Sequence, residues 1–215
     1  RIGTFNQGQG SFSQIGGLTP FGTSWGYAVQ AGTAFMTGSR YENSIVYQTP
    51  SFAGFQVTAM YSMGGQDEGE NESTTDRYYG VAASYKNGPL FGYLAVDSTN
   101  YATWTSDHPE DYWNNGVWTE ATDEYAHDLD DSLTVTLGGS YNFEVAKVYF
   151  GAQYFDNVKS TGIGGISKDY AAEVKFDGTK LSALYLEGYA VTLGVDAPVA
   201  VGKVMAALGY IDAET

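Results

Sequence analysis

The sequence predicts an all-β fold, an antiparallel transmembrane β-barrel, on three observations. Apolar and polar residues alternate with period two along most of the chain, its connections alternate between short and long, and aromatic residues gather near the ends of the alternating segments. Alternation of this kind is typical of strands with one apolar and one polar face. We find no long stretch with a helical period.

The alternation defines about eight strands. In one of them Phe55, Val57 and Tyr61 alternate with polar Gln56 and Thr58. Similar patterns place the strands near residues 43–49, 54–63, 77–86, 89–98, 132–142, 146–155, 187–196 and 201–211.

The connections between these strands alternate in length. Short links at 49–54, 86–89, 142–146 and 197–202 separate long, polar links at 64–76, 99–131 and 156–186. This order puts every long link at the same end of the sheet. Outer-membrane barrels sort short periplasmic turns from long external loops in this way, and strands of about ten residues fit a tilted crossing of a bilayer. We therefore expect the three long links to be external loops.

Aromatic residues near the strand ends support a membrane location, because interfacial girdles of such residues flank the apolar band of a barrel. Tyrosine is also common in strands of soluble proteins, so a soluble β protein stays open at this point. The residues concerned are Tyr47, Phe52, Phe55, Tyr61, Tyr79, Tyr85, Phe91, Tyr141, Tyr154, Tyr189 and Tyr210.

Composition excludes several classes of protein. The 215 residues carry 10 Lys plus Arg against 25 Asp plus Glu, a formal charge of −15, which argues against nucleic acid as a partner. The absence of cysteine from this sequence excludes disulfides, thiolate zinc sites and cysteine nucleophiles within it.

The segment Arg40-Tyr-Glu-Asn-Ser-Ile-Val-Tyr-Gln-Thr-Pro-Ser-Phe-Ala-Gly-Phe55 resembles the Arg-x-x-Asn-Ser-x-x-Tyr-x-(Ser/Thr)-Pro-x-Phe-x-Gly-Phe signature of the general trimeric porins of Gram-negative bacteria. Residues 79–89 resemble the next hairpin of that family. The resemblance implies a 16-stranded outer-membrane barrel that works as a homotrimer and is no enzyme. It also implies contact with the lipid bilayer and lipopolysaccharide, passage of small hydrophilic solutes, and no cofactor. With about eight to nine strands represented, the sequence is interpreted as a central part of one barrel domain, 1–215, that lacks both ends.

The same resemblance implies an inward-folded third loop at residues 4–39, which narrows the pore as a constriction loop. Its aromatic and glycine residues suit packing on a barrel wall, and residues 2–39 contain no Asp, Glu, Lys or Arg. The acidic loop residues usual in the family therefore have no counterpart here. The residues expected at the constriction are Pro20, Phe21, Gly22, Trp25 and Tyr27.

Four basic residues are candidates for the pore lining. The resemblance assigns Arg1 to the end of the strand before the loop and Arg40 to the start of the strand after it. Lys147 and Lys203 fall on the polar parity of their strands, and a charge on the lipid face at mid-membrane would cost ~2–4 kcal/mol. Alternatively, the two lysines lie near short turns and extend to the membrane interface.

Acidic residues concentrate in the first two long links, which hold 14 of the 25. Such a vestibule attracts cations and repels anions in a salt-dependent way, so we expect a mild cation preference set at the mouth. Closely spaced carboxylates could bind Ca²⁺, but no EF-hand spacing is present and diffuse counterions are the favoured interpretation. The vestibule residues are Asp67, Glu68, Glu70, Glu72, Asp123, Glu124, Asp128, Asp130 and Asp131.

Three further signals define alternatives. Gly22-Thr23-Ser24-Trp25-Gly26 matches a serine-hydrolase elbow but lacks the strand before it and the helix after it that the motif requires. His108 and His127 lie beside carboxylates and could bind a transition metal, although loop histidines are usually only solvated. The aromatic residues of 99–131 could bind sugars, which leaves a soluble or surface all-β carbohydrate-binding protein as the second hypothesis.

Overall fold

A computed structural model of the chain describes residues 3–5, 16–21, 41–63, 76–101, 104–105, 112–114, 117–119, 126–127, 130–159, 175–176, 179–180 and 185–214. No helix in this part of the chain is long and apolar enough to cross a membrane. Its helical content is one 3₁₀ turn, η1, at Gly16–Leu18.

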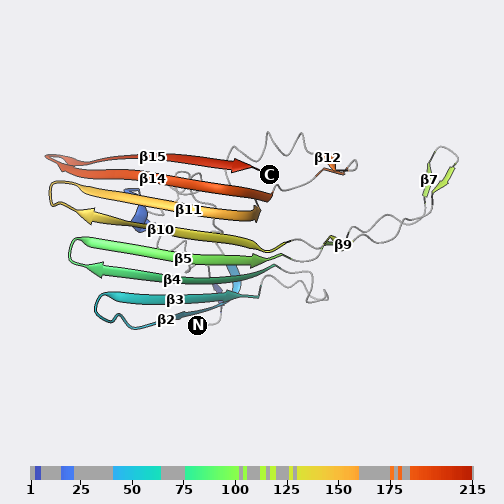
Figure 1. Ribbon diagram of the computed structural model, residues 1–215, viewed down its shortest axis with the longest axis horizontal. Coiled ribbons are helices and arrows are strands. Elements are labelled where there is room, and N and C mark those ends of the chain that lie inside the picture. The colour runs from blue at the N-terminus through green and yellow to red at the C-terminus, as the bar shows by residue number, and fades with distance from the viewer. Residues whose placement is uncertain are drawn as a thin grey trace.

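Most of the described residues form an antiparallel sheet of nine strands in the order β1-β2-β3-β4-β5-β10-β11-β14-β15 (Figure 1). The prediction of an all-β antiparallel fold is confirmed. The sheet is open in this chain, with β1 and β15 at its two edges. Its strands are β1 (Gly3–Phe5), β2 (Tyr41–Gln48), β3 (Phe55–Ser62), β4 (Arg77–Asn87), β5 (Leu90–Asn100), β10 (Ser132–Asn142), β11 (Lys147–Lys159), β14 (Tyr185–Val199) and β15 (Gly202–Glu214).

Neighbouring strands are joined by short turns at one end of the sheet and by long connections at the other (Figure 1). The β4–β5 turn has the residues that its geometry requires. Asn87 pairs with Leu90, so Gly88-Pro89 forms a two-residue hairpin loop in which Gly88 has a φ of +54°. A Gly-Pro pair suits a type II′ turn, since only the first central residue needs a positive φ.

Several strands extend further than the alternation predicts, β11 and β14 most clearly. β11 continues to Lys159 and β14 begins at Tyr185, where the sequence indicated strands at 146–155 and 187–196. The register between them shifts between Phe155 and Val158, and Asn157 has a φ of +50°. A bulge interrupts period two, so the pattern ends before the pairing does.

Short ladders lie within two of the long connections, where the sequence predicted only loop. β6 (Trp104–Thr105) pairs with β9 (Ala126–His127), and β7 (Tyr112–Asn114) pairs with β8 (Val117–Thr119). β12 (Lys175–Phe176) pairs with β13 (Thr179–Lys180). Strands of two or three residues are too short to show an alternation.

The two faces of the nine-stranded sheet differ in character. We call the face that η1 covers the inner face; there Leu18 of η1 packs with Ala82, Tyr93 and Ala95 of β4 and β5, all buried. The opposite, outer face exposes large apolar side chains from every long strand. They include Ile45, Val57, Val81, Leu94, Val96, Leu137, Phe150, Val191, Leu193, Val195, Val204 and Leu208.

Candidate functional site

The inner face is lined mainly by hydroxyl, amide and glycine residues in the middle of the strands. Gln153 of β11 donates from Nε2 to Thr136 Oγ1 of β10 at 2.7 Å, and Gln48 of β2 donates to Thr58 Oγ1 of β3 at 3.1 Å. Cross-strand pairs of this kind satisfy polar side chains on a face that is otherwise covered. The arrangement gives a polar wall on one side of a sheet whose other side is apolar.

Two buried carboxylates belong to this wall. Asp97 of β5 accepts hydrogen bonds from the hydroxyl groups of Tyr78 and Thr134. Asp196 of β14 accepts one from the Tyr149 hydroxyl at 2.5 Å and forms an ion pair with Lys203 Nζ at 3.4 Å. Hydroxyl donors and a cation offset the loss of hydration that burial imposes on a carboxylate.

Both lysines singled out in the sequence lie on the inner face at the end with the short turns. Lys147 Nζ sits 4.7 Å from the ring centroid of Tyr149, and Lys203 reaches Asp196. Lys86 of β4 lies on the same face and at the same end, because its register neighbour Phe91 packs with the Leu18 cluster. Lys86 is not among the pore-lining residues predicted from the sequence, although it alternates with the outward Tyr85 and its parity places it on the inner face.

Residues 16–21 pack on the inner face. A Cβ placed on Gly194 of β14 would lie 2.5 Å from Pro20 Cδ, and one on Gly138 of β10 would lie 2.8 Å from Leu18 Cδ2. The two glycines therefore leave room for the two side chains of the segment. Phe21 N–H donates to Thr19 Oγ1 at 3.4 Å, which closes a local turn at this point.

Many of the predicted site residues lie outside the described residues. They are Arg1, Arg40, Gly22, Trp25, Tyr27, Asp67, Glu68, Glu70, Glu72, Asp123, Glu124 and Asp128, together with Ser24 and His108 of the alternative sites.

Asp130 and Asp131 are described, and both are exposed at the end with the long connections. Asn100 Nδ2 donates to Asp131 Oδ1 at 2.7 Å. Within the described part of the chain, no three His, Asp or Glu side chains form a group that could hold a metal ion.

Aromatic pairs mark two levels on the outer face. Near the short turns Phe55 lies beside Tyr85, with ring centroids 4.4 Å apart, and near the long connections Tyr61 lies beside Tyr79 at 5.1 Å. Six residues separate the two levels along β3, which is about 20 Å of strand. Because the strands of a membrane barrel are tilted by about 35–45°, this length corresponds to about 15 Å along the membrane normal, which fits within the ~25 Å apolar band of such a barrel.

Comparison with known proteins agrees with this geometry. The family model of the Gram-negative porins matches residues 3–215. The chain belongs to the Gram-negative porin family. This confirms the resemblance seen in the sequence, and it argues against the hydrolase and the soluble carbohydrate-binding alternatives.

Individual relatives are outer membrane porins. The chain is 27% identical to an outer membrane porin protein of Bordetella pertussis over 84% of its length and 47% of the relative's. It is 33% identical to outer membrane porin protein 32 of Delftia acidovorans over 61% of its length and 31% of that protein's. Among solved structures, the anion-selective porin from Comamonas acidovorans matches with a TM-score of 0.50 and 26% identity, covering 82% of this chain and 41% of the other.

The chain thus spans about half or less of the length of these relatives. Its family localises it to the outer membrane, as the sequence predicted, and points to a passive channel and not to an enzyme. The cation preference expected from the acidic loops finds no support in these comparisons, because the solved neighbour is named as anion-selective.

Proposed function

We propose that this chain forms part of the wall of an outer-membrane diffusion channel for small hydrophilic solutes and ions. The observation that carries the proposal is the division of one antiparallel sheet into an exposed apolar face and a polar face. The apolar face, with aromatic pairs at two levels, suits lipid, and the polar face suits a water-filled lumen. The chain spans about half or less of the length of its relatives, so we propose that it supplies part of such a barrel.

The segment 16–21 supports a constriction inside that lumen. Its Leu18 and Pro20 pack against the wall over Gly138 and Gly194, so the chain that continues from it starts from the inner face. We propose that residues 4–39, including Pro20, Phe21, Gly22, Trp25 and Tyr27, narrow the pore. Arg1, Arg40, Lys147 and Lys203 are proposed to line it.

The proposed ion preference is mildly cationic and set at the external mouth. The carboxylates of the long connections outnumber the basic groups there, and a negative vestibule raises the local cation concentration. The inner-face lysines act in the opposite sense at the other end of the barrel. The preference is therefore weak and depends on ionic strength.

The proposed assembly is a homotrimer in contact with the bilayer and lipopolysaccharide. It uses no cofactor, and the acidic loops are neutralised by diffuse counterions in place of a tightly bound Ca²⁺. The family resemblance supports the homotrimer and the lack of a cofactor, and the apolar outer face supports the contact with lipid.

A planar-bilayer recording of the full-length native protein tests the proposed function. Under a KCl gradient we expect ohmic conductance steps and a reversal potential on the cation side of zero that declines as salt is raised. An anion-selective reversal would keep the channel and overturn the ion preference. The absence of steps from folded protein would overturn the channel itself.

A further inference from the structure

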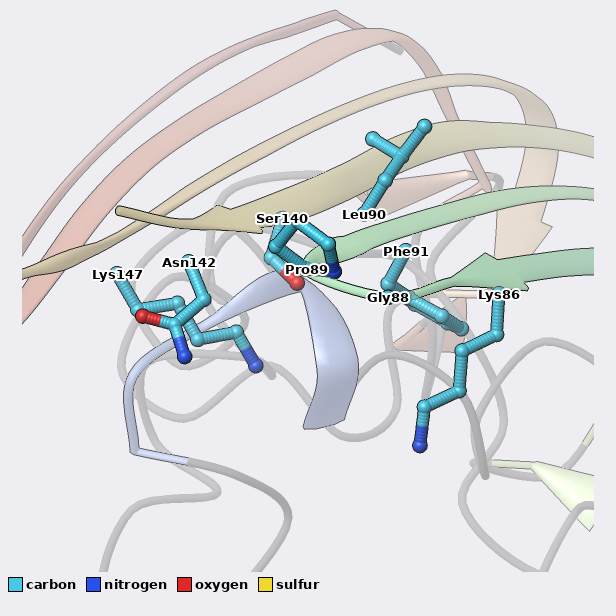
Figure 2. Close-up of a pocket in the computed structure, with 8 residues that line it drawn as sticks. All are labelled: Lys86, Gly88, Pro89, Leu90, Phe91, Ser140, Asn142 and Lys147. Atoms are coloured by element: carbon cyan, nitrogen blue, oxygen red, sulfur yellow. The ribbon is translucent and has the colours of Figure 1, made fainter. Parts of the chain in front are cut away.

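A pocket of about 140 Å³ lies on the inner face near the short turns, between the hairpins β4–β5 and β10–β11. Its polar side chains are Lys86, Ser140, Asn142 and Lys147. Figure 2 shows Ser140 between Lys86 on one side and Asn142 with Lys147 on the other. These four side chains present hydrogen-bond donors, and the described residues that line the pocket include no carboxylate.

Ser140 gives the clearest sign that the pocket takes a ligand. Its side chain is buried, with the residue 5% exposed, and among the described residues its Oγ has no hydrogen-bond partner. A buried hydroxyl left unpaired costs free energy, so a partner in the pocket would recover it. The hydroxyl belongs to a pocket that is also lined by the two lysines, so an anionic oxygen is its favoured partner.

Asn142 is oriented as a donor toward the same space. Its Oδ1 accepts the backbone N–H of Glu144 at 3.0 Å, in the turn between β10 and β11. This bond fixes which end of the amide faces the turn, so Nδ2 remains to donate to a ligand.

Lys86 and Lys147 carry positive charges that no carboxylate of the described residues neutralises in an ion pair. The nearest carboxylate to Lys147 along the ladder is Asp196, its register partner in β14, and that group is engaged by Lys203 and Tyr149. Lys147 instead lies over the Tyr149 ring.

We propose that this pocket is a binding subsite for a small multivalent oxyanion, such as inorganic phosphate, on the pore wall at the short-turn end. The two lysines stand on opposite sides of the pocket (Figure 2), an arrangement that suits an anion with two charges and several oxygens better than chloride or acetate, which carry a single charge. The site rests on the proposed function and adds to it a place on the pore wall where anionic solutes bind. It predicts that anions bind locally in a channel whose mouth favours cations.

The test uses the folded full-length protein in detergent and measures binding of inorganic phosphate by line broadening of its ³¹P resonance. We expect saturable binding, weakened about tenfold in the Lys86→Gln/Lys147→Gln double variant and several-fold in Ser140→Ala. Acetate should compete poorly.

Matched controls separate a site from general charge. Lys159→Gln removes the same charge from the other end of β11, and Ser44→Ala removes a second buried hydroxyl without a partner, on β2 and away from the pocket. Both should bind phosphate as the native protein does. Equal weakening by Lys159→Gln and Lys147→Gln, or no phosphate binding by the native protein, would overturn the proposal.

Current recordings then connect the site to the channel. Phosphate should reduce the chloride current of the native channel and do so less in the double variant. Binding that is lost in the variants but occurs in a protein that forms no channel would support the subsite and overturn the proposed function. Channels that conduct with no phosphate binding would overturn the subsite alone.

Discussion

At the scale of single residues, the inner face is built from polar groups that hold one another in place. Asp97 accepts hydrogen bonds from Tyr78 and Thr134 on the two strands beside its own, and only 5% of the residue is exposed. A carboxylate so placed ties three strands together through charge-assisted hydrogen bonds.

Replacing Asp97 by Ala should lower the free energy of unfolding of the full-length protein by about 1–3 kcal/mol, because two buried hydroxyl groups lose their acceptor. Denaturant unfolding of the protein in detergent measures this. Asp131→Ala is the control: that side chain is exposed and bonds to one exposed amide, so its removal should change stability by less than about 0.5 kcal/mol. Equal effects of the two changes would show that Asp97 does not stabilise the wall.

Gly194→Ala should displace residues 16–21 from the wall, because the added Cβ would lie 2.5 Å from Pro20 Cδ. The next residue that it would approach is Tyr149, at 3.5 Å, which is an ordinary contact distance. Overpacking of this kind costs about 1–3 kcal/mol or moves the neighbour, and the neighbour here is a loop segment. We expect a lower single-channel conductance, because the segment moves toward the lumen. Gly92→Ala, whose Cβ would meet nothing within 4 Å, should conduct as the native protein does. A conductance unchanged in both variants would contradict the packing of Pro20 against Gly194 on the inner face.

At the scale of elements, period two determines which side of each strand meets lipid. Val96 of β5 lies mid-strand on the outer face, paired across the ladder with Val81 and Val135, and is 43% exposed. Val201 lies in the turn between β14 and β15 and is 99% exposed.

Val96→Arg should therefore destabilise the membrane-inserted protein by about 2–4 kcal/mol, whereas Val201→Arg should cost only about 0–1 kcal/mol, as expected at the midplane and at the interface of a bilayer. Unfolding titrations of the protein in lipid vesicles give both values. In a water-soluble sheet both arginines would be exposed to water, and both changes would be nearly neutral.

The alternation was sufficient to predict the eight long strands because each strand places apolar side chains on the outer face and polar or small side chains on the inner face. It failed where geometry departs from period two: the bulge at Asn157 hides the end of β11, and the short ladders β6–β9, β7–β8 and β12–β13 have no pattern to detect. The candidate site was predicted only in part. Lys147 and Lys203 followed from parity. The pocket depends on the pairing of β4, β5, β10 and β11, which brings together Lys86 and Lys147, 61 positions apart in sequence (147 minus 86), with Ser140.

At the scale of the whole molecule, charge is distributed unevenly along the barrel axis. The described carboxylates Asp76, Asp130, Asp131, Glu187 and Glu214 lie at the end of the long connections, where the basic residues Arg77 and Lys159 also stand at strand ends. Lys86, Lys147 and Lys203 lie at the end of the short turns, where Asp196 pairs with Lys203 and Glu144 is exposed in the β10–β11 turn. An axial difference of this kind favours cations at one mouth and retains anions near the other.

Replacing Asp130 and Asp131 together by Asn should move the reversal potential under a KCl gradient toward the anion side. An Asn at position 131 keeps a side-chain oxygen that can accept the hydrogen bond from Asn100 Nδ2. The double change therefore removes the two charges and little else. The shift should be largest at low salt and vanish near 1 M KCl, where screening acts over about 3 Å. A shift that persists at high salt would place these groups inside the narrow part of the pore and not at its mouth.

The central claim is that the inner face lines water and the outer face meets lipid, and adjacent residues of β15 test it most directly. Ala207 lies opposite Gly194 on the inner face, whereas Leu208 lies opposite Leu193 and is 79% exposed on the outer face. The segment has no cysteine, so single Ala207→Cys and Leu208→Cys variants of the full-length protein add one thiol each to it. A charged, membrane-impermeant thiol reagent should reduce the current through open Ala207→Cys channels and leave Leu208→Cys channels unchanged. Reaction at position 208 and not at 207, or at both equally, would contradict the account.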